Sequence, residues 1–167
     1  KAMSLGAIQD PSLVKEMGAE IARQFRVLGM HVNFAPVVDV NSNPDNPVIG
    51  FRAFGEDKEG VTQRAIAYMK GLQENGVLAN AKHFPGHGDT NKDSHKTLPV
   101  IKYGIKRLQE VEFLPFIKAI NEGTSTGNDW FSNGELIISP VTNFNFMYPM
   151  NIIKSEDLVE KIRKCMI

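Results

Sequence analysis

Apolar residues recur at helical spacing in two segments of the first half of the chain. In the first, Asp10 is a suitable N-cap, Pro11 suits the first helical position, and Gly29 follows the last apolar residue. The apolar positions between them are Val14, Met17, Ile21, Phe25 and Leu28. The second segment carries Val61, Ala65, Met69 and Leu72 and ends near Asn75-Gly76. The spacing predicts one helix in each segment.

Short continuous apolar runs follow the two helical segments. Val32 to Val40 and Val77 to Lys82 are the first two, and Leu136 to Ser139 is a third. A further helix is expected from about Ile105 to Glu122, and a last one from Ser155. Buried strands that alternate with helices predict an α/β fold with a parallel sheet, whose functional loops follow the carboxyl ends of the strands.

The rhythm breaks in residues 124–150, which are rich in Asn, Gly, Ser and Thr. Apart from its one short apolar run, we expect this segment to be irregular. The 167 residues are otherwise expected to form one domain, because their length suffices for a single core.

Charge and hydropathy exclude several classes of protein. Lys and Arg together equal Asp and Glu, 19 each, which argues against a nucleic-acid-binding surface. No apolar run approaches the roughly 18 residues that cross a bilayer. The one cysteine, Cys165, excludes a disulfide framework and a paired-cysteine zinc site, and we expect it to fill core space.

Three of the four histidines fall between Lys82 and His95. A metal site is one interpretation, since imidazole and carboxylate groups suit zinc or iron. Pro85-Gly86 prevents a helix that would bring two histidines together, so the spacing matches no known ligand frame. The potential ligands are His83, His87, Asp89, Asp93 and His95.

Two other interpretations involve proton transfer and sugar recognition. In an extended loop Asp93 and His95 project to the same side, so the carboxylate could orient the imidazole as a general acid/base. Lys82 and His83, at the end of a predicted strand, and Arg52, between Phe51 and Phe54, can hydrogen-bond polar substrates. Solvated loop residues are the alternative for all of them, while His87 and Asp89 are expected to shape the loop.

Two blocks of sequence resemble the N-terminal barrel of glycoside hydrolase family 3. They are NFAPVVDVNSNPDNPVIGFRAFGED (33–57) and AKHFPGHGDTNKDSHKTLPVI (81–101). The motif Asp93-Ser94-His95 is similar to that of the family's β-N-acetylglucosaminidase branch. The resemblance implies a (β/α)8 TIM-barrel-like fold, partial here because such a barrel takes about 250 residues.

The resemblance also implies a function and its residues. His95 would be the general acid/base, Asp93 its orienting partner, and Arg52, Lys82 and His83 would bind the sugar. The implied reaction is retaining hydrolysis of terminal β-linked N-acetylglucosamine from glycans or peptidoglycan fragments, with no cofactor and no metal. A β-glucosidase of the same family is the alternative within enzymes. Phosphate could also replace water as the acceptor, because a neutral imidazole does not repel an anion.

The family's nucleophilic Asp is expected to be missing. Asp129 is the only acidic residue after the dyad that we place in a loop, and its surroundings lack the nucleophile's sequence pattern. We expect the segment that bears the nucleophile to be absent between Gly123 and Gly127, and the chain to be incomplete. A non-catalytic sugar-binding fragment is therefore a third interpretation, and unpaired strand edges would favour self-association.

Overall fold

The computed structural model describes residues 1–93, 100–123, 136–140 and 152–153 of the chain. In the described parts, the helices are α1 (Ala2–Gly6), α2 (Pro11–Val27), α3 (Lys58–Gln73), α4 (Ile105–Glu110) and α5 (Leu114–Gly123), with a 3-10 turn η1 (Gly50–Arg52). The strands are β1 (Val32–Asn33), β2 (Leu78–Phe84), β3 (Leu136–Pro140) and β4 (Ile152–Ile153). Helix α1 is an element that the apolar pattern did not predict.

Helices α2 and α3 confirm the two helices expected from apolar spacing. The Asp10 carboxylate accepts a hydrogen bond from the Ser12 N–H, and the Asp57 carboxylate accepts one from the Gly60 N–H, so each helix has a side-chain N-cap. The two helices pack closely because glycines face each other. A Cβ on Gly71 would collide with the backbone of Lys15 and Gly18.

The expected strand from Val32 to Val40 is shorter in the structure. Only Val32–Asn33 pairs as a regular strand with β2, and Val37 makes an isolated bridge to Lys82. Pro36 has no N–H to donate, which prevents a continuous ladder. The segment still runs along β2, because Asn80 N–H donates to the Ala35 carbonyl and Val38 N–H donates to the Lys82 carbonyl.

The single helix expected from Ile105 to Glu122 is also a wrong prediction. It is two helices, α4 and α5, separated by Val111–Phe113. Pro115 explains the break: inside one long helix its ring would clash with the carbonyl of residue 111, whereas it fits the first turn of α5.

The break between α4 and α5 turns two side chains inward. Glu112 is buried, lies against Gly86, and accepts two hydrogen bonds of 2.7 Å from Arg107 Nη1. The Phe113 ring stacks on Phe84 at the end of β2. The corner between the helices therefore supports the loop that follows β2.

The described strands form one sheet in the order β1-β2-β3-β4. β1, β2 and β3 are parallel, which confirms the predicted parallel sheet, and β3 falls on the expected run at 136–139. β4 departs from the prediction because it pairs with β3 in the antiparallel sense. The expected helix from Ser155 and most of residues 124–150 lie outside the described residues.

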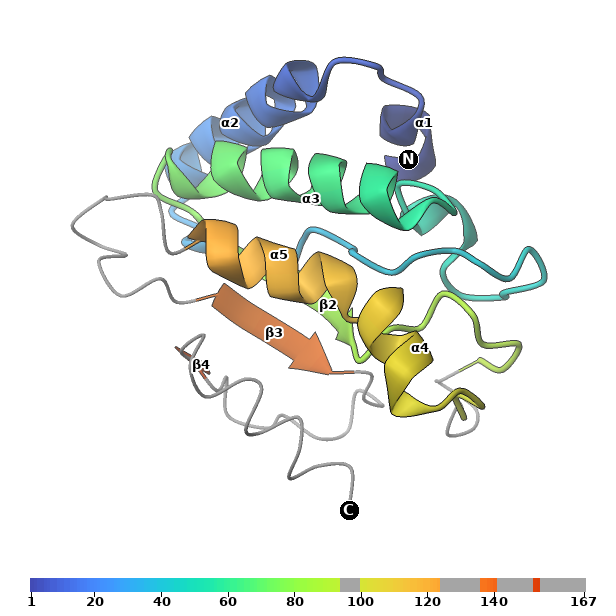
Figure 1. Cartoon of the computed structure of the whole chain (residues 1–167). Helices are drawn as coiled ribbons and strands as arrows, with labels where there is room; N and C mark the ends of the chain where they lie inside the picture. The colour runs from blue at the N-terminus through green and yellow to red at the C-terminus, as the bar shows by residue number, and fades with distance from the viewer. Residues whose placement is uncertain (94–99, 124–135, 141–151, 154–167) are drawn as a thin grey trace.

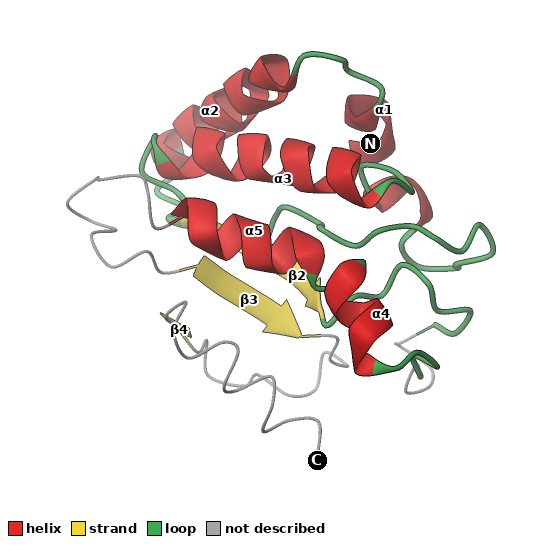
Figure 2. Cartoon of the chain, viewed as in Figure 1, coloured by secondary structure: helices red, strands yellow, loops and turns green. Residues whose placement is uncertain are grey.

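The helices α2, α3 and α5 form a layer against one face of the strands (Figure 1). Helix α3 lies between α2 and α5 and contacts β2. The fully buried side chains between the layers include Val14, Met69, Leu72, Val77 and Phe116. Figure 2 shows the long loops that follow β1 and β2 at the end of the sheet toward which the β3 arrowhead points, as expected of parallel α/β folds. None of the described helices combines the length and apolar character needed to cross a membrane.

Candidate functional site

Two loops meet at the carboxyl ends of the strands. The first follows the Val37 bridge and runs through Asn46, and the second follows β2 and runs through His87. The Asn46 side-chain amide donates to the His87 carbonyl at 2.6 Å, while its oxygen accepts from the N–H groups of Val48 and Ile49. Gly88 lies so close to the Val40 carbonyl that a Cβ would collide with it. These contacts fasten the two loops to each other.

Asp39 is the buried carboxylate at the base of both loops. Its side chain is 0% exposed. One oxygen accepts the His87 N–H at 2.7 Å, the other lies 2.6 Å from His83 Nδ1, and both lie 3.2 Å from the His83 backbone nitrogen. With its oxygens held by backbone and imidazole donors, Asp39 fixes the start of the second loop to the end of the first.

His83 connects the buried carboxylate to a cation. Its Nδ1 faces Asp39, and its Nε2 lies 3.2 Å from Nη2 of Arg52. Arg52 is held in turn by the Val48 carbonyl, at 3.3 Å from Nη1. The structure therefore brings together two of the predicted substrate-binding residues, which are 31 positions apart in the sequence.

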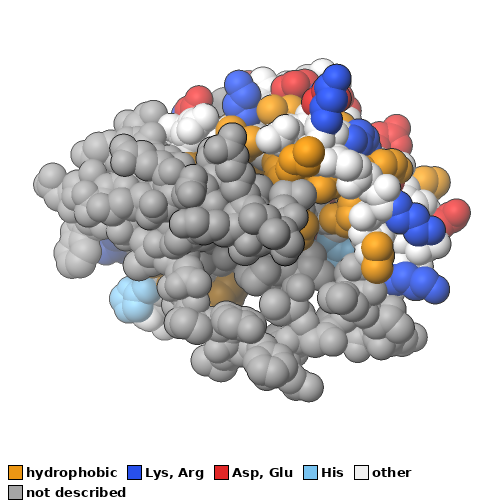
Figure 3. Space-filling view, turned by 60° about the horizontal axis from the view of Figure 1, so that its bottom comes forward, with side chains coloured by type: hydrophobic (Ala, Val, Ile, Leu, Met, Phe, Trp, Pro, Cys, Tyr) orange, Lys and Arg blue, Asp and Glu red, His pale blue; other side chains and the backbone are white. Residues whose placement is uncertain are grey.

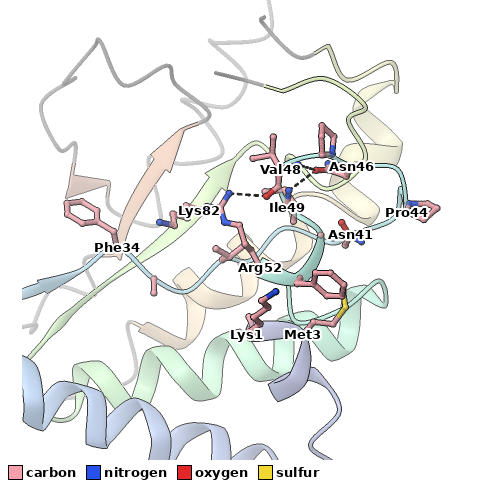
Figure 4. A pocket seen from close by; sticks show the side chains of 16 residues that line it. Lys1, Met3, Phe34, Asn41, Pro44, Asn46, Val48, Ile49, Arg52 and Lys82 are labelled. Atoms are coloured by element: carbon pink, nitrogen blue, oxygen red, sulfur yellow. Dashed lines mark hydrogen bonds between the residues drawn. The ribbon is translucent and has the colours of Figure 1, made fainter. Parts of the chain in front are cut away.

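Lys82 joins Arg52 in the lining of a cavity of about 850 Å³. In Figure 4 the two cationic side chains extend into the same space, with Phe34 on the other side of Lys82. Phe34 and Phe51 also line the cavity and are more than half exposed. Cationic donors beside aromatic rings can bind the hydroxyl groups and the apolar C–H face of a sugar.

Burial and the neighbouring Arg52 affect the charge of Lys82. Burial lowers the pKa of Lys82 below its ordinary value of 10.5, and the nearby Arg52 guanidinium lowers it further, while Asp39 opposes both. Proximity to a second cation raises the free energy of the Lys82 ammonium, so an anionic or hydroxyl-rich ligand would relieve part of that cost.

His87 is buried inside the second loop. Its side chain is 1% exposed, and Nδ1 makes a short hydrogen bond to the Thr90 hydroxyl. Burial lowers the pKa of His87 below 6.5, which favours a neutral imidazole. The contacts agree with the expectation that His87 shapes the loop. The half-buried Asp89 also shapes the loop, because it accepts a hydrogen bond from the Ser42 hydroxyl.

The predicted acid/base dyad is only partly described. Asp93 is half-buried and lies at the end of the described part of the second loop. His95 lies outside the described residues, so the pairing of Asp93 with His95 stays a prediction.

A metal centre was one interpretation of the histidine cluster. In the described parts of the chain, no three His, Cys, Asp or Glu residues are arranged to hold a metal ion. His83 Nδ1 is occupied by Asp39, and His87 Nδ1 by Thr90.

Sequence reasoning missed Asp39 and Asn46. Asp39 carried one available signal, since it is the single charge within the valine-rich run before the first loop. Asn46 carried none, because its three hydrogen bonds depend on a turn and on a partner loop 41 residues away.

The fold and the site define an α/β barrel-type domain with a cavity, lined by cationic and apolar side chains, at the carboxyl ends of its strands. The sequence model for the glycosyl hydrolase family 3 N-terminal domain matches residues 1–126. The chain therefore belongs to glycoside hydrolase family 3.

Three similar proteins illustrate the range of the family. The chain is 43% identical over 121 residues to β-hexosaminidase A of Pseudoalteromonas piscicida, which covers 71% of this chain and 20% of that protein. A family 3 β-N-acetylglucosaminidase from a Paenibacillus species superposes with a TM-score of 0.70 at 45% identity, covering 71% of this chain and 23% of the other. The β-glucoside phosphorylase BglX gives a TM-score of 0.70 at 28% identity, with coverages of 72% and 22%.

The comparisons support two statements about the chain. The solved structures confirm the fold as part of an α/β barrel. The chain also spans only about a fifth of the length of the first curated relative.

Proposed function

We propose that this chain carries the sugar-binding part of a family 3 active site that acts on terminal β-linked N-acetylglucosamine in glycans or peptidoglycan fragments. The observation that carries the proposal is that two of the three predicted sugar-binding residues line one cavity and the third contacts one of them. Arg52 and Lys82 line it, and His83 contacts Arg52 directly. The names of the similar proteins from Pseudoalteromonas and Paenibacillus support the choice of substrate.

The proposed reaction is retaining hydrolysis. His95, oriented by Asp93, would protonate the leaving oxygen while a carboxylate attacks the anomeric carbon, and the same imidazole would then activate water to release the sugar. Asp39 is the described carboxylate nearest to the sugar-binding residues by its contacts, but it is buried and occupied by N–H donors. We therefore place the nucleophile outside the described residues.

Because the sequence predicts that the nucleophile is missing, we expect the chain to bind the sugar without hydrolysing it. We expect saturable binding of N-acetylglucosamine by calorimetry, weaker binding of glucose, and no turnover of an aryl N-acetyl-β-glucosaminide. Equal affinity for glucose would favour the β-glucosidase alternative, and measurable turnover would exclude a non-catalytic fragment.

Arg52→Gln tests the assigned cavity. The variant removes a cation from the cavity and the contact with His83, so we expect a loss of sugar affinity of about 10- to 100-fold. Arg23→Gln is the matched control, since Arg23 is exposed on α2 and pairs with Glu20. The assignment is wrong if the two variants bind N-acetylglucosamine equally well while both remain folded.

Self-association is a second part of the proposal. Val27 and Leu28 are 76% and 71% exposed at the end of α2, next to Met30 and to β1, the first strand of the described sheet. Apolar side chains beside a strand that is paired on one side only in the described sheet favour association between copies.

A further inference from the structure

The acceptors and donors around His83 determine which of its ring nitrogens carries the proton. An ionised carboxylate only accepts hydrogen bonds, and the Asp39 oxygens face the N–H groups of His83 and His87 as well as His83 Nδ1. Nδ1 must therefore be the protonated nitrogen that donates to Asp39.

The other side of the ring gives the same answer independently. A guanidinium only donates hydrogen bonds, and Arg52 Nη2 lies 3.2 Å from His83 Nε2. Nε2 must therefore present a lone pair. A proton on Nε2 would place two donors against each other.

We propose that Asp39 is a positioning residue that holds His83 in the Nδ1–H form. In this form, Nε2 of His83 accepts a hydrogen bond from a sugar hydroxyl. This inference rests on the proposed function. The cationic side chains of Lys82 and Arg52 only donate hydrogen bonds, so they would bind the oxygen of a hydroxyl. His83 would accept the hydrogen bond that the same hydroxyl donates. The site then recognises a hydroxyl as donor and acceptor together, which a ring of cations alone cannot do.

The burial of Asp39 matters for this role. Its side chain is 0% exposed and does not line the cavity that Arg52 and Lys82 line. It therefore acts on a ligand through His83, as an orienting carboxylate does in a catalytic triad. Its two contacts with backbone N–H groups keep the carboxylate in place when the imidazole exchanges Arg52 for a ligand.

The form of the ring can be measured without any ligand. Long-range proton–nitrogen correlation on the chain labelled with ¹⁵N-histidine reports which nitrogen of each imidazole is protonated, and His83→Gln identifies the His83 signals. We expect the neutral Nδ1–H form near neutral pH. An Nε2–H form or a fully protonated ring in the unmodified chain would overturn the proposal.

Asp39→Asn separates positioning from structural support. The amide keeps an oxygen for the His87 N–H but presents an NH₂ group to His83 Nδ1, so the ring should switch to the Nε2–H form. Asp45→Asn is the matched control, because Asp45 is an exposed carboxyl in the same loop. We expect the first variant to lose at least about tenfold in affinity for N-acetylglucosamine and the control to lose none. The positioning role of Asp39 would be refuted if the folded Asp39→Asn chain showed His83 in the Nε2–H form and bound N-acetylglucosamine with unchanged affinity.

Deoxyfluoro derivatives of N-acetylglucosamine test the acceptor role in the unmodified chain, whether or not Asp39→Asn folds. Fluorine can accept from Lys82 or Arg52 but cannot donate to His83. At one ring position the fluoro derivative should bind about as weakly as the deoxy derivative. If every fluoro derivative binds with the affinity of the parent sugar, His83 accepts no hydrogen bond from a sugar hydroxyl, and the proposal is wrong. If the parent sugar does not bind at all, the proposed function fails, while the measured form of His83 still stands or falls on its own.

Discussion

Burial determines the charge of individual ionisable residues around the two loops. It lowers the pKa of Lys82 and of His87, which disfavours their cationic forms, and it raises the pKa of Glu112 against the opposing effect of Arg107. For each of these three groups, desolvation changes the pKa more than the neighbouring charges do. The site therefore contains groups whose protonation is coupled to folding.

The coupling at His87 predicts how stability depends on pH. Because the pKa of His87 is below 6.5 in the folded chain, the unfolded state binds more protons than the folded state at pH values between the lowered pKa and 6.5. The stabilisation is fully present above pH 6.5 and decreases as the pH falls through that window. We expect the free energy of unfolding, measured with urea, to fall less between about pH 7.5 and about pH 5 in His87→Asn than in the unmodified chain.

His31→Asn is the control for this experiment. His31 is exposed, so its replacement should leave the pH dependence of the unmodified chain in place. An equal loss of stability in the His87→Asn chain and the unmodified chain would show that His87 is not responsible.

At the scale of elements, small residues and prolines decide where helices begin, end and touch. The α4–α5 break follows from Pro115, and the close approach of α2 to α3 follows from Gly18 and Gly71. Glycine has no side chain and proline acts through its backbone geometry, so the apolar periodicity that locates the helices contains no information about these breaks and contacts.

The glycine contact predicts a large effect of a small substitution. In Gly71→Ala the new methyl group would meet the backbone of Lys15, which cannot move without separating the two helices. We expect a net loss of about 1–3 kcal/mol in the free energy of unfolding, despite the higher helix propensity of alanine. Gly55→Ala is the control, since nothing lies within 4 Å of its added methyl. Urea denaturation would contradict the prediction if Gly71→Ala were as stable as the unmodified chain.

At the scale of the whole molecule, the chain exposes apolar surface that a complete barrel domain would be expected to cover. The exposed side chains include Val27, Leu28 and Phe34. Figure 3 shows uncovered hydrophobic side chains among charged ones on the described part of one face. Exposed apolar side chains of this kind are the surface on which the proposed self-association rests.

We predict concentration-dependent self-association through the end of α2. Replacing Val27 and Leu28 together by lysine should shift the sedimentation profile toward monomer at a given concentration, because it adds charge beside the edge of β1. Val100→Lys is the control, since Val100 is also an exposed apolar residue but belongs to another segment. A monomer at every concentration in the unmodified chain would disprove self-association.

The sequence alone determined the local elements and the family. Apolar spacing and capping residues located α2 and α3, an apolar run located β2, and two sequence blocks indicated the family and the residues Arg52, Lys82 and His83. Each of these depends on neighbours in the chain, because caps, periodicity and motifs are local properties.

Only the tertiary structure decided how the site is assembled. Asp39 and His83 are 44 positions apart, and their hydrogen bond exists because parallel strands bring their carboxyl ends to one edge of the sheet. Likewise, the orientation of His83 depends on Arg52, from a third segment of the chain. Such contacts depend on which strands lie side by side and in which register, so the spacing of residues along the chain could not predict them.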